Sequence, residues 1–484
     1  MANGRWWLTR MGIVVLLLAT GCSAPGAVGD TPSDDATTRL YGHAAKERPV
    51  GFTYQPDVVV VGGGVNPVHS AGADGLTWVL DGDAPGVDDL RPGSVMFATS
   101  RAVGRVVELT PTGDGDVHVL LAPVELTEVI RDGRLRIDTA IDPSQMQFQV
   151  IPDRPGALAD PEADPEPGFP GTGPIVRPSA FRPGGPAVAA AAASRPLPPP
   201  VKNGAEVGVG SWIVKTAYSA GKLELKVGTP ATDRLKVFID LAIGVRNLRL
   251  RTDTTIANGR VGSFDAALEG LESIAVDIAA GAAGGASDNG KVRIELPVDN
   301  TLYIPGEVPT VLNVKSKLIV ITAFGGRNDT LTAGGVWTVK GALGISGGSL
   351  TVPEFGVQRS IIDSITGISL APVGLVFAAE QRVLVGIGVP GFAAGPYLKL
   401  SFSVGVTNGS ALGVPYARCV NAALDIKGAA GLALGISDPT LRELLPKLPG
   451  WVKPKVELTT ERESSIASRK QTLPQSPICL AGST

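Results

Sequence analysis

Polar and apolar residues alternate along several stretches of the chain after residue 200. Clear examples are residues 222–227, 291–296 and 398–404. Successive side chains of a β-strand point to opposite faces, so this period predicts strands with one buried and one polar face. Half-buried strands of this kind are typical of antiparallel sheets. The pattern therefore predicts a large antiparallel β-sandwich or distorted barrel over residues 207–454.

Two segments of that region do not follow a simple alternation. In residues 263–285, Leu268, Leu271 and Ile274 fit a helix, whereas Ile274, Val276 and Ile278 fit a strand, so both interpretations stay open. Residues 438–445 begin with Asp-Pro and carry an acid in the first turn, which predicts a short helix.

The N-terminal half contains a smaller set of strand patterns. Residues 94–97 follow a turn, and residues 105–109 and 116–120 flank Thr-Gly-Asp-Gly, which predicts a β-hairpin. Residues 123–130 fit one short helix. We expect a small β-barrel or β-roll domain over residues 51–151.

The segments between and around these units differ in composition. Residues 152–200 hold 14 of the 39 prolines, a density that no sheet or helix interior sustains, so residues 152–206 are predicted to be an extended Pro/Ala-rich linker. An ordered Pro-rich loop packed on a domain is the alternative. Residues 22–50 are small and polar and fit a flexible tether. Residues 455–484 follow the end of the alternation and are expected to form a C-terminal tail.

Composition supports a mainly β, globular chain. Hydrophobic residues make up 44% and charged residues 18%, with 62 Gly among 484 residues. These values exclude a disordered chain, and frequent turns with few helices account for the glycine. The formal net charge is −3, and no Lys/Arg run with interleaved aromatics occurs, so nucleic acid is not an expected partner.

The first 22 residues have the layout of an export signal. Arg5 and Arg10 precede a short apolar run at residues 13–19, which is followed by Thr20, Gly21 and Cys22. The sequence Leu-Ala-Thr-Gly-Cys resembles the lipobox of bacterial lipoproteins. The resemblance implies that residues 1–21 are a signal peptide removed by signal peptidase II, and that the Cys22 thiol carries a diacylglycerol.

The same resemblance implies a location for the protein. Two or three acyl chains give stable anchoring, so the chain is expected on a bacterial cell membrane or outer membrane, facing the periplasm or the exterior. Removing residues 1–21 changes the balance from 43 basic and 46 acidic residues to 41 and 46, a net charge of −5. This charge argues against electrostatic binding to anionic lipid.

Two cysteines remain if Cys22 carries lipid. In an exported, oxidising compartment, Cys419 and Cys479 are expected to form a disulfide that ties the tail to the large domain. The alternative is a pair of buried free thiols.

The sequence offers little recognisable catalytic chemistry. No Cys-x-x-Cys motif occurs and the histidines are His43, His69 and His118, so no metal centre or cofactor is expected. A looser calcium site near Asp81, Asp83 and Asp88 stays open, because carboxylates on Gly-rich loops suit that ion. Carboxylate-pair chemistry would need two nearby acids, and the candidates by residue type are Glu295, Glu354 and Glu380.

These observations favour a lipid-anchored envelope protein with a non-enzymatic binding or scaffolding role towards an envelope or extracellular ligand. A carrier of lipid or another apolar ligand is the first alternative, and a deep apolar pocket in the large domain would support it. A carboxylate-dependent enzyme acting on glycosides is the second.

Overall fold

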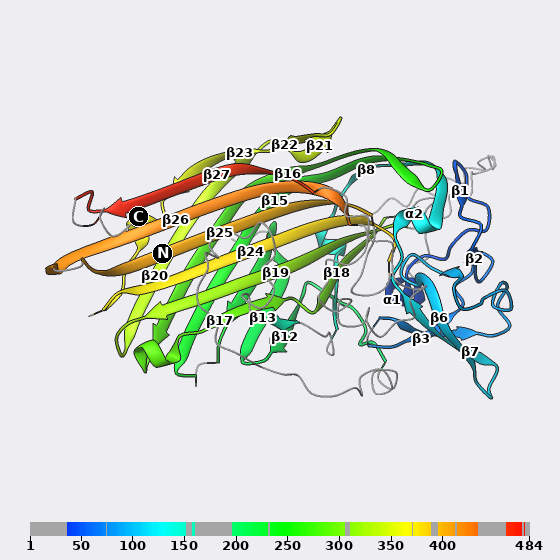
Figure 1. Cartoon of the computed structure of the whole chain (residues 1–484), viewed down its shortest axis with the longest axis horizontal. Coiled ribbons are helices and arrows are strands. Elements are labelled where there is room, and N and C mark those ends of the chain that lie inside the picture. Colours follow the sequence, from blue (N-terminus) through cyan, green and yellow to red (C-terminus); the bar gives the residue numbers. More distant parts are fainter. Residues whose placement is uncertain are drawn as a thin grey trace, which may run out of the picture. The chain divides into compact units, whose positions relative to one another are not determined.

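The fold is given by a computed structural model, which describes residues 36–73, 75–151, 157–159, 196–230, 233–304, 310–369, 371–388, 395–411, 414–433, 461–476 and 479. All of these residues belong to one compact unit, Asp35–Thr484. Two short helices occur in the described part, α1 (Ala36–Tyr41) and α2 (Leu126–Val129), together with 3-10 turns at Pro143–Gln145, Gly285–Asp288 and Ile362–Ser364. Strands make up most of the rest (Figure 1).

The N-terminal region contains a small six-stranded sheet with the order β2-β5-β6-β7-β4-β3. Its strands are β2 (Val58–Val60), β3 (Val68–Ala71), β4 (Thr77–Asp81), β5 (Val95–Phe97), β6 (Val103–Pro111) and β7 (Asp116–Ala122). β2 and β5 run parallel and the other pairs are antiparallel, so the sheet is mixed. The predicted hairpin is present as β6–β7, and the predicted short helix as α2.

The first large sheet has eleven strands in the described part of the chain. Its main order is β12-β13-β14-β15-β16-β20-β23, with β8 and β1 extending one side of β15, and β21 and β22 extending β16. The bounds are β1 (Phe52–Tyr54), β8 (Ile130–Ala140), β12 (Gly204–Val209), β13 (Trp212–Ser219), β14 (Lys222–Gly228), β15 (Leu235–Ala257), β16 (Arg260–Ala282), β20 (Asp329–Lys340), β21 (Leu343–Ser346), β22 (Ser349–Thr351) and β23 (Glu354–Arg359).

The second large sheet has ten strands in the described residues. Its main order is β11-β9-β18-β19-β24-β25-β26-β27, with β17 beside β19 and β10 beside β17. The bounds are β9 (Gln147–Val150), β10 (Leu158–Ala159), β11 (Val201–Lys202), β17 (Lys291–Glu295), β18 (Val298–Ile304), β19 (Thr310–Phe324), β24 (Val373–Gly386), β25 (Gly395–Ala411), β26 (Val414–Ala433) and β27 (Arg462–Leu473).

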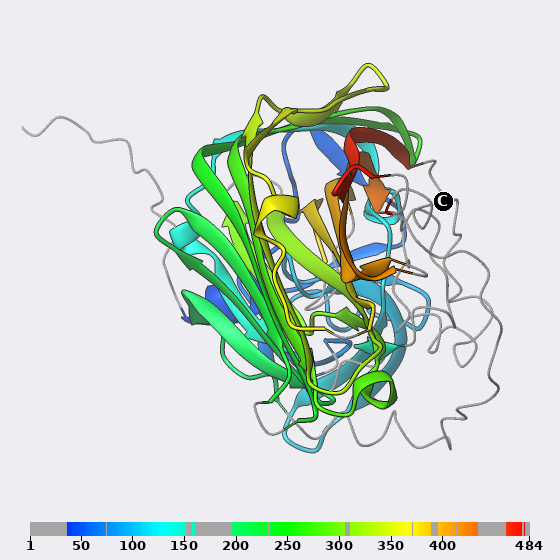
Figure 2. The same cartoon turned by 90° about the vertical axis from the view of Figure 1, so that its left-hand side faces the viewer.

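The two large sheets face each other across one hydrophobic core (Figure 2). Alternate residues of the long strands enter this core, for example Ile239 and Leu241 from β15 and Phe402 and Val404 from β25. Every strand pair in both sheets is antiparallel, and no pair between described strands joins one sheet to the other. The predicted mainly β chain, with a small N-terminal sheet and a large antiparallel C-terminal region, is confirmed, and the sheets do not close into a barrel.

The longest strands explain how the first large sheet is assembled. β15 and β16 are 23 residues each, against the usual 3–10. β15 pairs with β14 up to Gly244, and beyond a register shift it pairs with β8 from Arg249 onwards. Gly270 lies opposite this irregularity with a φ of +93°, a conformation that favours glycine.

β16 shows which of the two interpretations of residues 263–285, helix or strand, is correct. Residues 260–282 form one strand rather than a helix, because β15 and β20 supply hydrogen-bond partners on both sides and Ile274, Val276 and Ile278 all enter the core. The helical spacing of Leu268, Leu271 and Ile274 results from the register shift near Val245.

The large sheets begin before the Pro-rich segment, earlier in the chain than the composition indicates. β8 and β9, which the sequence groups with the N-terminal unit, pair with β15 and β18 in the large sheets. The described ends of the Pro-rich segment are also paired: β10 with β17, Pro196 with Gly72, and β11 with β9. Residues 160–195 lie outside the described residues.

The C-terminal segment corrects the expectation that strand structure ends near Pro454. Residues 462–473 form β27, which pairs with β26 from Arg462 to Leu473. Its residues are mostly exposed and polar on a strand at the end of the sheet, so hydrophobic alternation is weak there. The expected helix at residues 438–445 lies outside the described residues.

Candidate binding site

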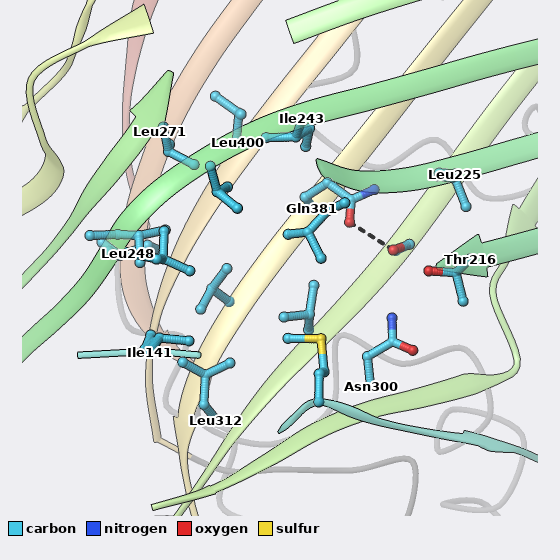
Figure 3. A pocket seen from close by; sticks show the side chains of 18 of the residues that line it. Ile141, Thr216, Leu225, Ile243, Leu248, Leu271, Asn300, Leu312, Gln381 and Leu400 are labelled. Atoms are coloured by element: carbon cyan, nitrogen blue, oxygen red, sulfur yellow. Dashed lines mark hydrogen bonds between the residues drawn. The ribbon is translucent and has the colours of Figure 1, made fainter. Parts of the chain in front are cut away.

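An apolar cavity lies between the two large sheets (Figure 3). Its volume is about 80 Å³, several times the roughly 10–15 Å³ that one water molecule requires on the same measure. Both sheets contribute, and most of the lining side chains are aliphatic. The lining residues are Ile141, Met146, Phe148, Thr216, Leu223, Glu224, Leu225, Leu241, Ile243, Val245, Leu248, Leu268, Leu271, Asn300, Leu312, Val314, Ser316, Leu343, Gln381, Val383, Leu398 and Leu400.

The aliphatic wall follows from strand alternation. Leu223 and Leu225 of β14 lie opposite Ile243 and Leu241 of β15 in register, so their side chains share the inner face. Leu398 and Leu400 of β25 form the corresponding wall on the other sheet. The register shift of β15 brings Leu248 into the cavity.

One end of the cavity is polar. Figure 3 shows Thr216 and Asn300 on one side together with Leu225, Gln381 nearer the middle, and Ile141, Leu248 and Leu271 on the other side. Ser316 Oγ donates a hydrogen bond to Gln381 Oε1 at 2.7 Å, so these two groups satisfy each other. Asn300 is 3% exposed, and its Oδ1 atom has no hydrogen-bond partner. A buried amide oxygen without a partner is uncommon in native proteins, because desolvation is then uncompensated.

Charge is scarce around the cavity. Glu224 is the charged residue among the described lining residues, and its Oε2 lies 3.1 Å from Lys226 Nζ. The Glu224 side chain is 27% exposed and alternates with the inward Leu223 and Leu225. Its charge is therefore compensated outside the cavity, which leaves a neutral interior.

The cavity approaches the surface on its β14–β16 side. Leu223, Ile243 and Leu271 are only partly buried, whereas the remaining leucines of the lining are buried.

A charged cluster occupies the opposite face of the second large sheet. Glu461 Oε1 accepts from Lys399 Nζ, and Tyr397 OH donates to Glu461 Oε2. Glu380 lies 3.1 Å from Arg382 and 3.7 Å from Lys399. Burial, with Glu461 beside it, raises the pKa of Tyr397. Burial opposes ionisation of Glu461, but the hydrogen bond and charge of Lys399 outweigh it and lower the pKa of that carboxyl.

The carboxylates predicted by residue type are not brought into one cleft. The register aligns Glu295 of β17 and Glu380 of β24 on either side of Lys317 of β19, which favours a row of alternating charges. Glu354 lies on β23 in the other large sheet and is exposed.

Asp81 is the last residue of β4, and the other two residues of the possible calcium site, Asp83 and Asp88, lie in the loop that follows. Asp81 Oδ1 accepts a hydrogen bond from the Asp83 backbone at 3.0 Å, as turn-forming aspartates commonly do. Within the described residues, no group of three or more His, Cys, Asp or Glu is arranged to hold a metal ion.

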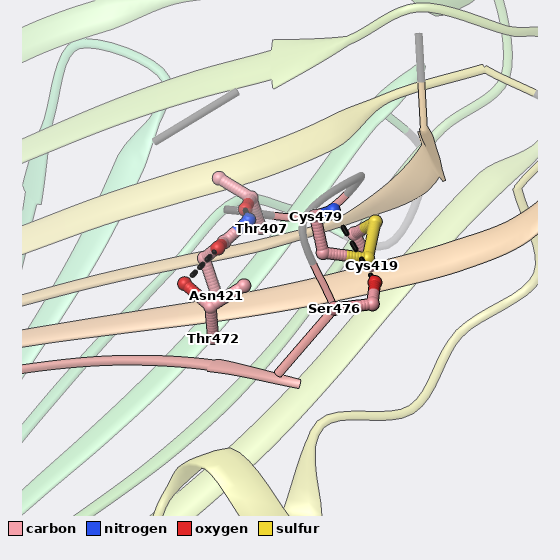
Figure 4. The surroundings of a disulfide bond; sticks show 6 residues. All are labelled: Thr407, Cys419, Asn421, Thr472, Ser476 and Cys479. Carbon is pink, nitrogen blue, oxygen red and sulfur yellow. Dashed lines mark hydrogen bonds between the residues drawn. A yellow bond between two sulfur atoms is a disulfide. The ribbon is translucent and has the colours of Figure 1, made fainter. Parts of the chain in front are cut away.

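The predicted disulfide between Cys419 and Cys479 is confirmed. Cys419 and Cys479 form a disulfide with a Cα–Cα distance of 5.5 Å, and both residues are buried (Figure 4). Cys22 lies outside the described residues, so its lipidation stays a prediction. In the part of the chain that the structure describes, no helix has the length and apolar character to span a membrane.

Sequence reasoning missed the polar end of the cavity. Asn300, Ser316 and Gln381 each occupy an inward position of a strand whose other inward residues are apolar, such as Val298 and Leu302 beside Asn300. A single polar residue among the apolar residues on one face of a predicted strand was the sequence signal that could have indicated this polar site.

Comparison with known proteins returns two family matches. The model of a domain of unknown function, DUF8402, matches residues 193–459, and that of a second domain of unknown function, DUF8403, matches residues 37–132. Neither the curated proteins nor the solved structures contain a match. The first family match covers most of the two facing sheets, and the second covers the small sheet.

Proposed function

We propose that this chain, which belongs to the DUF8402 family, binds an apolar ligand between the two sheets of its large β region. The observation that carries the proposal is the cavity lined by aliphatic side chains from both sheets. Ligand pockets are concave and mainly apolar with a few placed polar groups, and this cavity has that composition. The half-buried side formed by Leu223, Ile243 and Leu271 would admit the ligand.

The proposal includes the location inferred from the N-terminal sequence. The lipobox-like residues ending in Cys22 support an exported protein attached to a bacterial membrane by acyl chains. A carrier so attached would exchange an apolar molecule with the adjacent membrane or with an envelope partner. No described feature supports scaffolding in particular. The glycoside-active alternative is weaker, because Lys317 lies between Glu295 and Glu380 in the strand register.

Filling the cavity tests the proposal. Val314 lines it from β19, and Val314→Phe adds volume where space exists. We expect 1-methoxydecane, an uncharged probe without a hydrogen-bond donor, to bind the full-length chain and to bind the variant at least tenfold more weakly. Binding is measured by displacement of a fluorescent apolar dye. Because the ring occupies empty space, the melting temperature should stay equal or rise.

The matched control is Val357→Phe, which makes the same change on β23 at a side chain that is 42% exposed. This variant should bind as the natural chain does. If Val314→Phe fails to fold, Val383→Phe makes the same change from β24. Absence of probe binding by the natural chain, or equal binding by both cavity variants and the control, would contradict the proposed function.

A further inference from the structure

We infer that the cavity selects a neutral amphiphile with a hydroxyl-bearing head, which hydrogen-bonds to Asn300 at the polar end while its hydrocarbon lies among the leucines. This inference rests on the proposed function and names the chemistry of its ligand. The motivating atom is Asn300 Oδ1, which lacks a hydrogen-bond partner on a side chain that is 3% exposed.

The first step concerns what the polar end lacks. Ser316 and Gln381 are already joined by a 2.7 Å hydrogen bond, so their dipoles compensate each other. The Asn300 oxygen has no such partner, and Asn300 is one of the residues that line the same cavity. A ligand that donates a hydrogen bond there would remove the penalty of a buried unsatisfied acceptor. A ligand without a donor would keep that penalty.

The second step concerns the charge of the ligand. The described lining holds no cation, and its one carboxylate, Glu224, is compensated by Lys226 at 3.1 Å. An ionised head group would therefore be buried without a counter-charge, which is far more costly than burying a hydroxyl. This argument excludes free fatty acids and amines and favours an uncharged head.

The third step concerns the choice of a hydroxyl among neutral groups. The amide of Asn300 presents an acceptor and donors on the same carbon, and a hydroxyl can both donate and accept. Thr216 brings a second hydroxyl to this end from β13 of the opposite sheet. A hydroxyl head therefore fits between side chains from both sheets, whereas an ether or ester head can only accept.

The fourth step concerns the hydrocarbon. In Figure 3 the aliphatic residues Ile141, Leu248 and Leu271 lie away from Asn300 and Thr216. This separation of polar and apolar lining matches a molecule with one polar end. Since Leu271 is only partly buried, a chain running from Asn300 past these residues would emerge on the β14–β16 side.

The test compares two probes that differ in one hydrogen-bond donor, 1-decanol and 1-methoxydecane. We expect the full-length natural chain to prefer the alcohol by about tenfold, as a satisfied buried acceptor commonly gives. Asn300→Leu keeps a similar side-chain volume without polar atoms. This variant should lose the preference for the alcohol and should still bind 1-methoxydecane. Decanoate at neutral pH should bind more weakly than either neutral probe.

Two further variants separate a recognition role from a structural one. Asn300→Ser keeps a hydrogen-bonding group and should retain part of the preference for the alcohol. Asn421→Leu makes the same substitution as the main variant on β26, where the amide bonds Thr407 and Thr472, and should leave the preference unchanged.

The outcomes distinguish the two proposals. If neither probe binds, the proposed function fails. If both probes bind the natural chain equally, the cavity is an apolar site and the inference about Asn300 is wrong while the proposed function stands. Equal preference in the natural chain and Asn300→Leu, with both folded, would likewise overturn the inference.

Discussion

Arg101 is a buried cation that links the small sheet region to the second large sheet. It lies between β5 and β6, and its side chain is 3% exposed. The guanidinium donates to Asp299 Oδ2, to Gln149 Oε1 at 2.7 Å and to Tyr303 OH at 3.1 Å. Thr301 Oγ1 donates to the same aspartate at 2.9 Å. The pair is thus desolvated and held by several neutral groups as well as by charge.

Removing this cation should be costly. Arg101→Ala leaves Asp299 buried without its counter-charge, and breaking such a pair typically costs about 3–5 kcal/mol. We expect the free energy of unfolding to fall by that amount in denaturant titration. Arg134→Ala is the matched control, because Arg134 pairs with Asp253 on a side chain that is 64% exposed. Exposed pairs contribute about 0–1 kcal/mol. Equal losses in both variants would contradict a special role for Arg101.

β27 is a strand that the pattern of hydrophobic residues does not predict. Its residues are largely exposed and polar, so the sequence has no hydrophobic alternation there that would predict a strand. Its place is set by hydrogen bonds to β26, by Thr472 Oγ1 donating to Asn421 Oδ1 at 2.7 Å, and by the disulfide that follows it (Figure 4). The spacing of 60 residues between Cys419 and Cys479 closes a long loop around this strand.

Breaking the disulfide should loosen β27 in particular. In Cys479→Ser we expect the stability to fall by about 2–5 kcal/mol. Amide hydrogen exchange should accelerate over residues 462–473 more than over β24, which lies inside the sheet. Cys419→Ser should give the same exchange pattern, because both changes remove one bond. Unchanged protection of β27 in both variants would show that strand pairing alone holds it.

The proposed attachment of the protein to a membrane depends on Cys22, which lies outside the described residues. If Cys22 receives a diacylglycerol, Cys22→Ser should abolish metabolic labelling with a fatty acid and leave the signal peptide in place. Cys479→Ser serves as the control, since it removes a different cysteine and should keep the label. A Cys22→Ser protein that still carries label would refute the lipoprotein proposal.

Much of the fold could be predicted from the local pattern of polar and apolar residues, whereas the cavity could not. Residues 222–227 and 291–295 are strands as their alternation predicts, and the disulfide is the pairing expected of the two cysteines that remain if Cys22 carries lipid. The alternation of Val298, Asn300 and Leu302 indicates that Asn300 shares their apolar face, but only the packing of the two sheets shows that this face lines a cavity.

The sequence by itself determined the mainly β character and many of the strands, because these depend on side-chain period along a short stretch. The number of cysteines made the Cys419–Cys479 disulfide the expected pairing. Tertiary structure decided the pairing of β8 with β15, the strand character of residues 260–282, and the cavity. Those features join residues that are distant in the chain; Arg134 and Asp253, for example, are 119 positions apart. Local preferences carry no information about such partners, since the choice among strands of similar alternation depends on which faces pack together.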